Sequence, residues 1–168
     1  MFLKDKLNVY SPDGQFLYEI QLPTGIVHPR HAIKLTNGNI VVSHEFSGFG
    51  FRGVCIVGKD GAIKKSCGGK SGSDVGQMNS PNYLAVDKDG FVFVADPTES
   101  RVLLLNPDLQ FESEILSKKK FSLRNTTRIC LDEPNGRLLV ADNEFESEKN
   151  LCSDGQIFIF CIKSQDCC

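Results

Sequence analysis

Residues 68 to 105 read GGKSGSDVGQMNSPNYLAVDKDGFVFVADPTESRVLLL. A glycine- and serine-rich linker leads into three short runs rich in β-branched and aromatic residues, 83–87, 91–96 and 101–105. Lys88-Asp89-Gly90 separates the first two runs, and glycine supplies the positive φ that a tight hairpin turn needs. Short runs of this kind, joined by turns, predict antiparallel strands rather than helices.

Two kinds of hairpin alternate along the whole chain. The first kind turns at Asp13, Asp60 and Asp108, and the second kind turns at Gly38, Gly90 and Gly136. The three aspartates are 47 and 48 residues apart, and each turn lies between two β-rich runs. If the four strands of one repeat are labelled a to d, the chain reads c-d, a-b-c-d, a-b-c-d, a-b-c. This pattern predicts 13 strands and no helix.

Repeats of four short strands are typical of the blades of a β-propeller. The expected fold class is therefore all-β, a partial array of about three antiparallel blades over residues 1–162. Its parts are a c-d pair (7–22), two blades (29–66 and 81–116), an a-b-c set (127–162) and a short tail (163–168).

The middle repeat resembles an NHL repeat. Its motif consists of Gly76-Gln77, Pro81, Leu84-Ala85-Val86-Asp87, Val94-Ala95-Asp96 and Arg101. The third repeat keeps Val140-Ala141-Asp142, whereas the first has His44 where aspartate is usual. The resemblance covers roughly residues 7–162 and is to the C-terminal propeller of tripartite-motif proteins. It implies a platform that binds proteins or RNA.

The repeated charged residues have a structural interpretation. We expect Asp96 and Arg101 to form an ion pair that ties strand b to strand c. Asp142 has no matching arginine, because Gln156 occupies the corresponding position. Scaffold residues recur from blade to blade, whereas catalytic residues rarely do, so no catalytic residue is assigned.

The candidate binding face is built from the residues that begin successive a strands. They are Arg30, His31, Asn82, Tyr83, Thr127 and Arg128. Strand a is innermost in a propeller, so these side chains are expected around the axial opening. Basic and aromatic residues suit a protein or peptide partner, and they also suit RNA, which stacks on aromatic rings. Phe49 and Phe51, in the loop between strands b and c, are a secondary candidate.

Several chemical sites are excluded or disfavoured. The segment 48–53 matches G-x-G-x-x-G, but the residues after it predict a strand, not the helix that a dinucleotide needs. A zinc-dependent lyase or a lactonase-like enzyme would need ligands from several blades, and all three histidines lie between residues 28 and 44. The acidic stretch 143–154 lacks the spacing of a calcium loop and is expected to be a solvated loop. We therefore expect a non-enzymatic scaffold without cofactor or metal.

The composition and the strand pattern indicate the cellular compartment of the protein and whether the chain is part of a larger one. The formal net charge is −2, no long apolar run favours membrane insertion, and the N-terminus lacks a secretory core. Seven cysteines at irregular spacing predict reduced thiols in a cytoplasmic protein, with Cys55, Cys67, Cys130 and Cys161 as small core residues. A strand pattern that begins and ends at strand c favours a fragment of a larger multidomain protein. Self-association through open blade edges is the alternative.

Overall fold

The computed structural model describes residues 5–46, 52–146 and 151–162. It contains 13 strands and two very short helices. The strands are β1 (Lys6–Tyr10), β2 (Phe16–Gln21), β3 (Ile26–Lys34), β4 (Ile40–Phe46), β5 (Arg52–Val57), β6 (Ile63–Gly68), β7 (Tyr83–Val86), β8 (Val92–Asp96), β9 (Arg101–Leu105), β10 (Phe111–Ser117), β11 (Thr126–Asp132), β12 (Arg137–Glu146) and β13 (Leu151–Cys161). The helices are the 3-10 turn η1 (Pro97–Glu99) and the single α-helical turn α1 (Lys118–Phe121).

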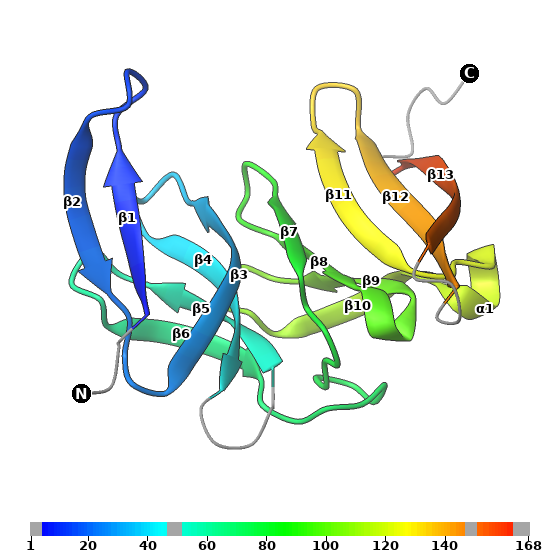
Figure 1. Cartoon of the computed structure of the whole chain (residues 1–168), viewed down its shortest axis with the longest axis horizontal. Coiled ribbons are helices and arrows are strands. Elements are labelled where there is room, and N and C mark those ends of the chain that lie inside the picture. The colour runs from blue at the N-terminus through cyan, green and yellow to red at the C-terminus, as the bar shows by residue number, and fades with distance from the viewer. Residues whose placement is uncertain (1–4, 47–51, 147–150, 163–168) are drawn as a thin grey trace.

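The strands form four antiparallel sheets, each made of consecutive strands. The sheets are β1-β2, β3-β4-β5-β6, β7-β8-β9-β10 and β11-β12-β13. They follow one another across the molecule from the N-terminal to the C-terminal end (Figure 1). The first strands of neighbouring sheets contact each other, β3 against β7 and β7 against β11. The predicted all-β fold class and the predicted 13 strands are confirmed.

The turns of the first hairpin kind share one backbone geometry. Gly14 and Gly61 follow the turn aspartates of the β1–β2 and β5–β6 hairpins and have φ of 84° and 76°. The third hairpin, β9–β10, has Leu109 at this position with φ of 58°. A leucine tolerates this strained region here because its side chain is buried in the core beneath the turn. None of the three predicted hairpins is helical.

The core lies between successive sheets, because the middle strands are covered on both faces. All five residues of β8 are buried, as are the last five residues of β5. Val41, Val54, Met78 and Leu103 belong to the cluster that joins the two four-stranded sheets. A separate cluster joins the β7–β10 sheet to the β11–β13 sheet. Burial of these apolar side chains stabilises the stacking of one sheet on the next.

Two local predictions were wrong. Lys118–Phe121 forms one helical turn, which ends at Ser122 in the left-handed conformation with φ of 55°. Residues 143–146 and 151–154 of the expected acidic loop instead lie in paired strands, because β12 and β13 continue their ladder as far as Glu146 and Leu151. Ladder pairing satisfies backbone N–H and C=O groups that an open loop would leave to water. In the described part of the chain, neither helix is long or apolar enough to cross a membrane.

Cys130 and Cys161 differ from the prediction of small, reduced core residues, whereas Cys55 and Cys67 are consistent with it. Cys55 is buried, and burial raises the pKa of its thiol to about 12, while Cys67 is half-buried. Cys130 is exposed, because strand alternation turns Ile129 into the core and Cys130 outward. Cys161 is exposed at the end of β13 and is disulfide-bonded, which contradicts the expectation of reduced thiols throughout.

Candidate functional site

A buried ion pair positions the strand that carries the centre of the site. Asp96 ends β8 and lies opposite Arg101, which begins β9. The Asp96 Oδ2 atom is 3.1 Å from the Arg101 Nη2 atom, and the two side chains are 0% and 4% exposed. The predicted ion pair between these residues is therefore present, and it does more than tie two strands together.

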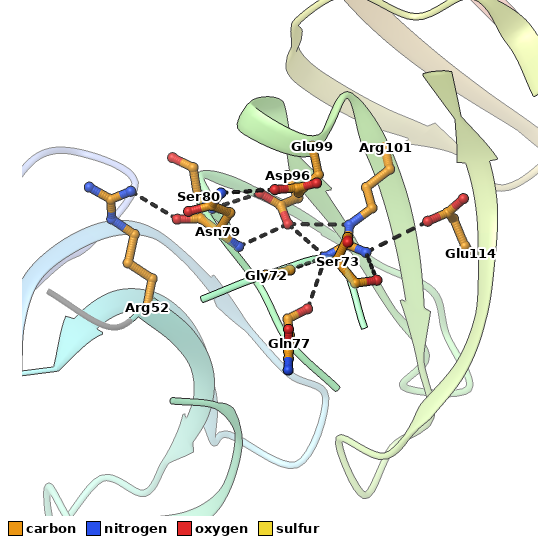
Figure 2. Close-up of polar contacts among 10 residues, drawn as sticks. All are labelled: Arg52, Gly72, Ser73, Gln77, Asn79, Ser80, Asp96, Glu99, Arg101 and Glu114. Atoms are coloured by element: carbon orange, nitrogen blue, oxygen red, sulfur yellow. Dashed lines mark hydrogen bonds and ion pairs between the residues drawn. The ribbon is translucent and has the colours of Figure 1, made fainter. Parts of the chain in front are cut away.

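The same pair fastens the linker that precedes β7 (Figure 2). The Asp96 carboxylate accepts the backbone N–H groups of Asn79 and Ser80 at 3.1 and 2.6 Å. The Arg101 guanidinium donates to the backbone carbonyls of Gly72, Ser73 and Gln77. A linker without regular secondary structure thus obtains charged partners for its backbone, and it delivers Tyr83 to the start of β7.

Of the other two repeats, one keeps the aspartate but lacks the arginine, and the other has histidine in place of the aspartate. Asp142 lies opposite Gln156 and accepts the backbone N–H groups of Arg124 and Asn125, each at 2.9 Å. His44 in β4 is 1% exposed, and its Nδ1 atom lies 3.0 Å from the carbonyl oxygen of Glu45. Burial lowers the pKa of His44, so the ring is neutral at neutral pH, and its Nε2 atom has no hydrogen-bond partner among the described residues.

We predict that Asp96→Ala lowers the free energy of unfolding by about 3 kcal/mol, because it leaves a buried guanidinium and two backbone N–H groups without their acceptor. Asp142→Ala removes a comparable acceptor but leaves no buried arginine, so its cost is about 1–2 kcal/mol. Urea unfolding of both variants beside the wild type measures the difference. An Asp142→Ala cost equal to or above that of Asp96→Ala contradicts the role given to Arg101.

Three of the predicted binding-face residues form a row across three sheets. His31, Tyr83 and Arg128 occupy equivalent positions, opposite Ser43, Ala95 and Ala141 in the next strand of each sheet. The His31 and Tyr83 rings lie 5.1 Å apart, and the Arg128 Cζ atom lies 3.9 Å from the centre of the Tyr83 ring. We call these three residues the inner row. The row joins β3, β7 and β11 by side-chain contacts.

The inner row presents hydrogen-bond donors from His31 and Arg128. The His31 Nδ1 atom accepts the backbone N–H of Leu84 at 3.2 Å, which leaves the proton of the neutral ring on Nε2. Burial, and secondarily the Arg128 charge, lower the pKa of His31, so this tautomer holds at neutral pH. Arg128 is exposed, and its guanidinium has no hydrogen bond or ion pair with any residue that the structure describes. The row therefore presents a partly aromatic surface with an exposed cation that is unpaired within the described structure.

The other three predicted binding-face residues form hydrogen bonds with nearby residues of the same or the neighbouring sheet. Arg30 donates to the Glu45 carboxylate at 2.6 Å. The Asn82 carbonyl oxygen accepts the Ser43 hydroxyl at 3.3 Å, which links β4 to the start of β7. Thr127 Oγ1 donates to the Ala141 carbonyl oxygen at 3.2 Å. These residues hold the strand ends in place beside the inner row and do not extend it.

Glu45 is the residue at this end of the sheets that sequence reasoning missed. Its carboxylate contacts Arg30 at 2.6 Å, His28 at 3.1 Å and Arg52 at 3.3 Å. Hydrogen bonds from Arg30 and then from His28 lower the pKa of Glu45 to about 2, with a smaller contribution from Arg52. No local pattern marks this residue, because its partners come from β3 and β5.

The depressed pKa of Glu45 predicts a pH-dependent contribution to stability. The contribution is fully present above the ordinary carboxyl pKa of about 4.5 and is lost as the pH falls through about 2. The stability advantage of wild type over Glu45→Gln should therefore shrink between pH 4.5 and pH 2. Chemical unfolding across this range measures it, with the exposed Glu112→Gln as control. An advantage that does not change over this range contradicts the charge cluster.

The remaining sequence-based predictions concern the Phe49 and Phe51 loop, metal binding and the G-x-G-x-x-G segment. Phe49 and Phe51, the secondary candidates, lie outside the described residues. Within the described ranges, no three His, Cys, Asp or Glu side chains are grouped so that they could hold a metal ion. The strand that was expected after the G-x-G-x-x-G segment is present as β5.

The comparisons with known proteins bear on the fold alone. No protein-family model and no curated protein matches the chain. A protein of unknown function from Bacteroides caccae aligns with 89% of this chain and 53% of its own, at 20% identity and a TM-score of 0.52. Kuenenia stuttgartiensis hydrazine synthase aligns over 90% and 50%, at 11% identity and a TM-score of 0.56. The chain thus spans about half the length of these two structures, with which it shares a β-rich fold.

Proposed function

We propose that this chain is a non-enzymatic interaction scaffold that binds a protein partner through the inner row. In this proposal the four sheets are a segment of an NHL-type β-propeller of about three blades. The order of consecutive strands and the contacts among the first strands β3, β7 and β11 support that architecture. Side chains on strands that are buried in the scaffold keep a fixed geometry, which lowers the entropic cost of binding.

The observation that carries the proposal is the stacking of Arg128 on Tyr83. The Arg128 guanidinium carries five N–H donors and lies over the Tyr83 ring. None of these donors is paired with another residue in the described structure. The His31 ring, which contacts Tyr83, adds a further N–H donor at its Nε2 atom. An aromatic centre beside an arginine is the composition of interface hot spots, and the guanidinium fork matches a carboxylate. The favoured partner is therefore an acidic peptide segment.

Charge argues for protein rather than RNA as the partner. RNA affinity depends on many phosphate contacts, each supplied by a lysine or arginine. Arg30 and Arg52 are already paired with Glu45, so Arg128 contributes the one unpaired arginine among those described at this end. The whole chain carries a net charge of −2. We therefore favour a protein partner, and the experiment below also measures RNA binding.

We predict that Tyr83→Ala weakens binding of an acidic peptide by at least about tenfold, because it removes the hot-spot ring and the support of Arg128. Tyr83→Phe keeps the ring and should retain most of the affinity. Arg128→Gln should lose affinity and flatten its salt dependence. Peptide-array screening followed by fluorescence anisotropy with the best acidic peptide measures these effects, and a shift assay with single-stranded RNA runs in parallel.

Lys119→Ala is the matched control, because Lys119 is an exposed cation in α1, outside the row. Losses that are equal for Lys119→Ala and the row variants overturn the site. RNA binding that depends on Tyr83 and Arg128, without peptide binding, overturns the choice of partner. Unchanged peptide affinity in Tyr83→Ala, with its melting temperature preserved, overturns the inner row as the contact surface.

A further inference from the structure

A cavity of about 480 Å³ lies between the two four-stranded sheets, at the opposite end of the strands from the inner row. It is bordered by the β3–β4 and β7–β8 turns, by the start of β6 and by Pro107 of the β9–β10 turn. Tyr83 begins β7, whereas Val86 ends it and lines the cavity. The volume is in the range of small-molecule sites in proteins. Nothing in the proposed function uses this cavity.

The floor of the cavity is apolar. Ile33, Leu35 and Val86 pack against the core cluster between the sheets and remain only partly buried. Ile56, a buried member of the same cluster, also contributes to the lining. Partly covered aliphatic side chains at the bottom of a cavity favour an apolar ligand group, because contact removes their surface from water.

The rim of the cavity carries charges of both signs, from four lysines and three acidic residues. Lys34, Lys64, Lys65 and Lys88 all contribute to the lining. Lys64 and Lys65 are paired with Asp60 and Asp108. The ammonium groups of Lys34 and Lys88 have no hydrogen bond or ion pair with the residues described. Two unpaired cations therefore border an apolar floor.

Two of the three carboxylates in the lining accept hydrogen bonds from the backbone of the β7–β8 turn. Asp87 Oδ1 accepts the backbone N–H groups of Asp89 and Phe91 at 3.0 and 2.8 Å. Glu133 Oε1 accepts the backbone N–H of Lys88 at 3.1 Å. Both carboxylates are thus engaged with backbone donors of the β7–β8 turn, and Asp89 is the exposed third one.

We propose that this cavity binds a small amphipathic anion, with an aliphatic body on the floor and a carboxylate or phosphate head between Lys34 and Lys88. An anionic head that lies between the two ammonium groups gains attraction from both. The body length is limited by the cavity volume to a medium-chain ligand. This site is independent of the inner row and of the protein partner proposed for it.

Isothermal titration calorimetry of the full chain with sodium octanoate tests the site. We expect binding with Kd on the order of 1 mM or tighter, and no binding of octylammonium or of acetate. The double variant K34Q/K88Q should bind octanoate about fivefold more weakly, with an unchanged melting temperature, because both side chains are exposed. K118Q/K119Q makes the same change in charge on α1 and should bind as the wild type does.

Three results would overturn the proposal. They are octylammonium binding as tight as that of octanoate, equal losses in the two lysine double variants, and no octanoate binding up to about ten times the expected Kd. Tyr83→Ala separates this site from the inner row. If that variant loses octanoate as K34Q/K88Q does, octanoate sits on the inner row and the cavity assignment is wrong. If octanoate binding stays intact while peptide binding is lost, two separate sites are supported.

Discussion

The buried ion pair between Asp96 and Arg101 fastens an irregular linker to the middle of the molecule, and the placement of the inner strands depends on it. The linker between β6 and β7 has many backbone groups that no ladder can satisfy. Asp96 takes two of its N–H groups and Arg101 takes three of its carbonyls. Charged partners make these hydrogen bonds stronger than neutral ones, which offsets the cost of burying the two charges.

The consequence reaches the candidate site through β7. With the linker held, Asn82 meets Ser43 of β4 and Tyr83 comes between His31 and Arg128. Each contact joins different sheets, so the inner row exists only when all three sheets are in register. A residue outside the inner row can therefore control the geometry of the row by positioning the strand that carries Tyr83.

The three repeats solve the same problem of strand entry in chemically different ways. The β7–β10 sheet uses a carboxylate with an arginine, and the β11–β13 sheet uses the Asp142 carboxylate opposite Gln156. The β3–β6 sheet has a neutral buried histidine at this position and places its charges one residue later, on Glu45. The Glu45 cluster takes its arginines from the neighbouring strands, and Arg52 also donates to the Asn79 carbonyl oxygen of the β6–β7 linker at 2.8 Å. Arg30 and Arg52 are ion-paired with Glu45, whereas the guanidinium of Arg128 has no hydrogen-bond partner in the described structure.

Sequence alone determined the features that depend on near neighbours in the chain. The hairpin turns, the 13 strands, the equivalence of His31, Tyr83 and Arg128, and the pairing of Asp96 with Arg101 all follow from spacing, turn chemistry and alternation. These are local, because the partners in a hairpin are separated by a short turn.

Tertiary structure alone decided what lies between the sheets. The stacking of the inner row, the ion pair of Arg30 with Glu45, and the cavity beside Lys34 and Lys88 depend on distances across sheets or between distant segments. A periodic pattern assigns a side chain to one face of a strand, but it does not say what the next sheet places opposite that face. That choice depends on how the sheets pack, which many side chains from the whole chain decide together.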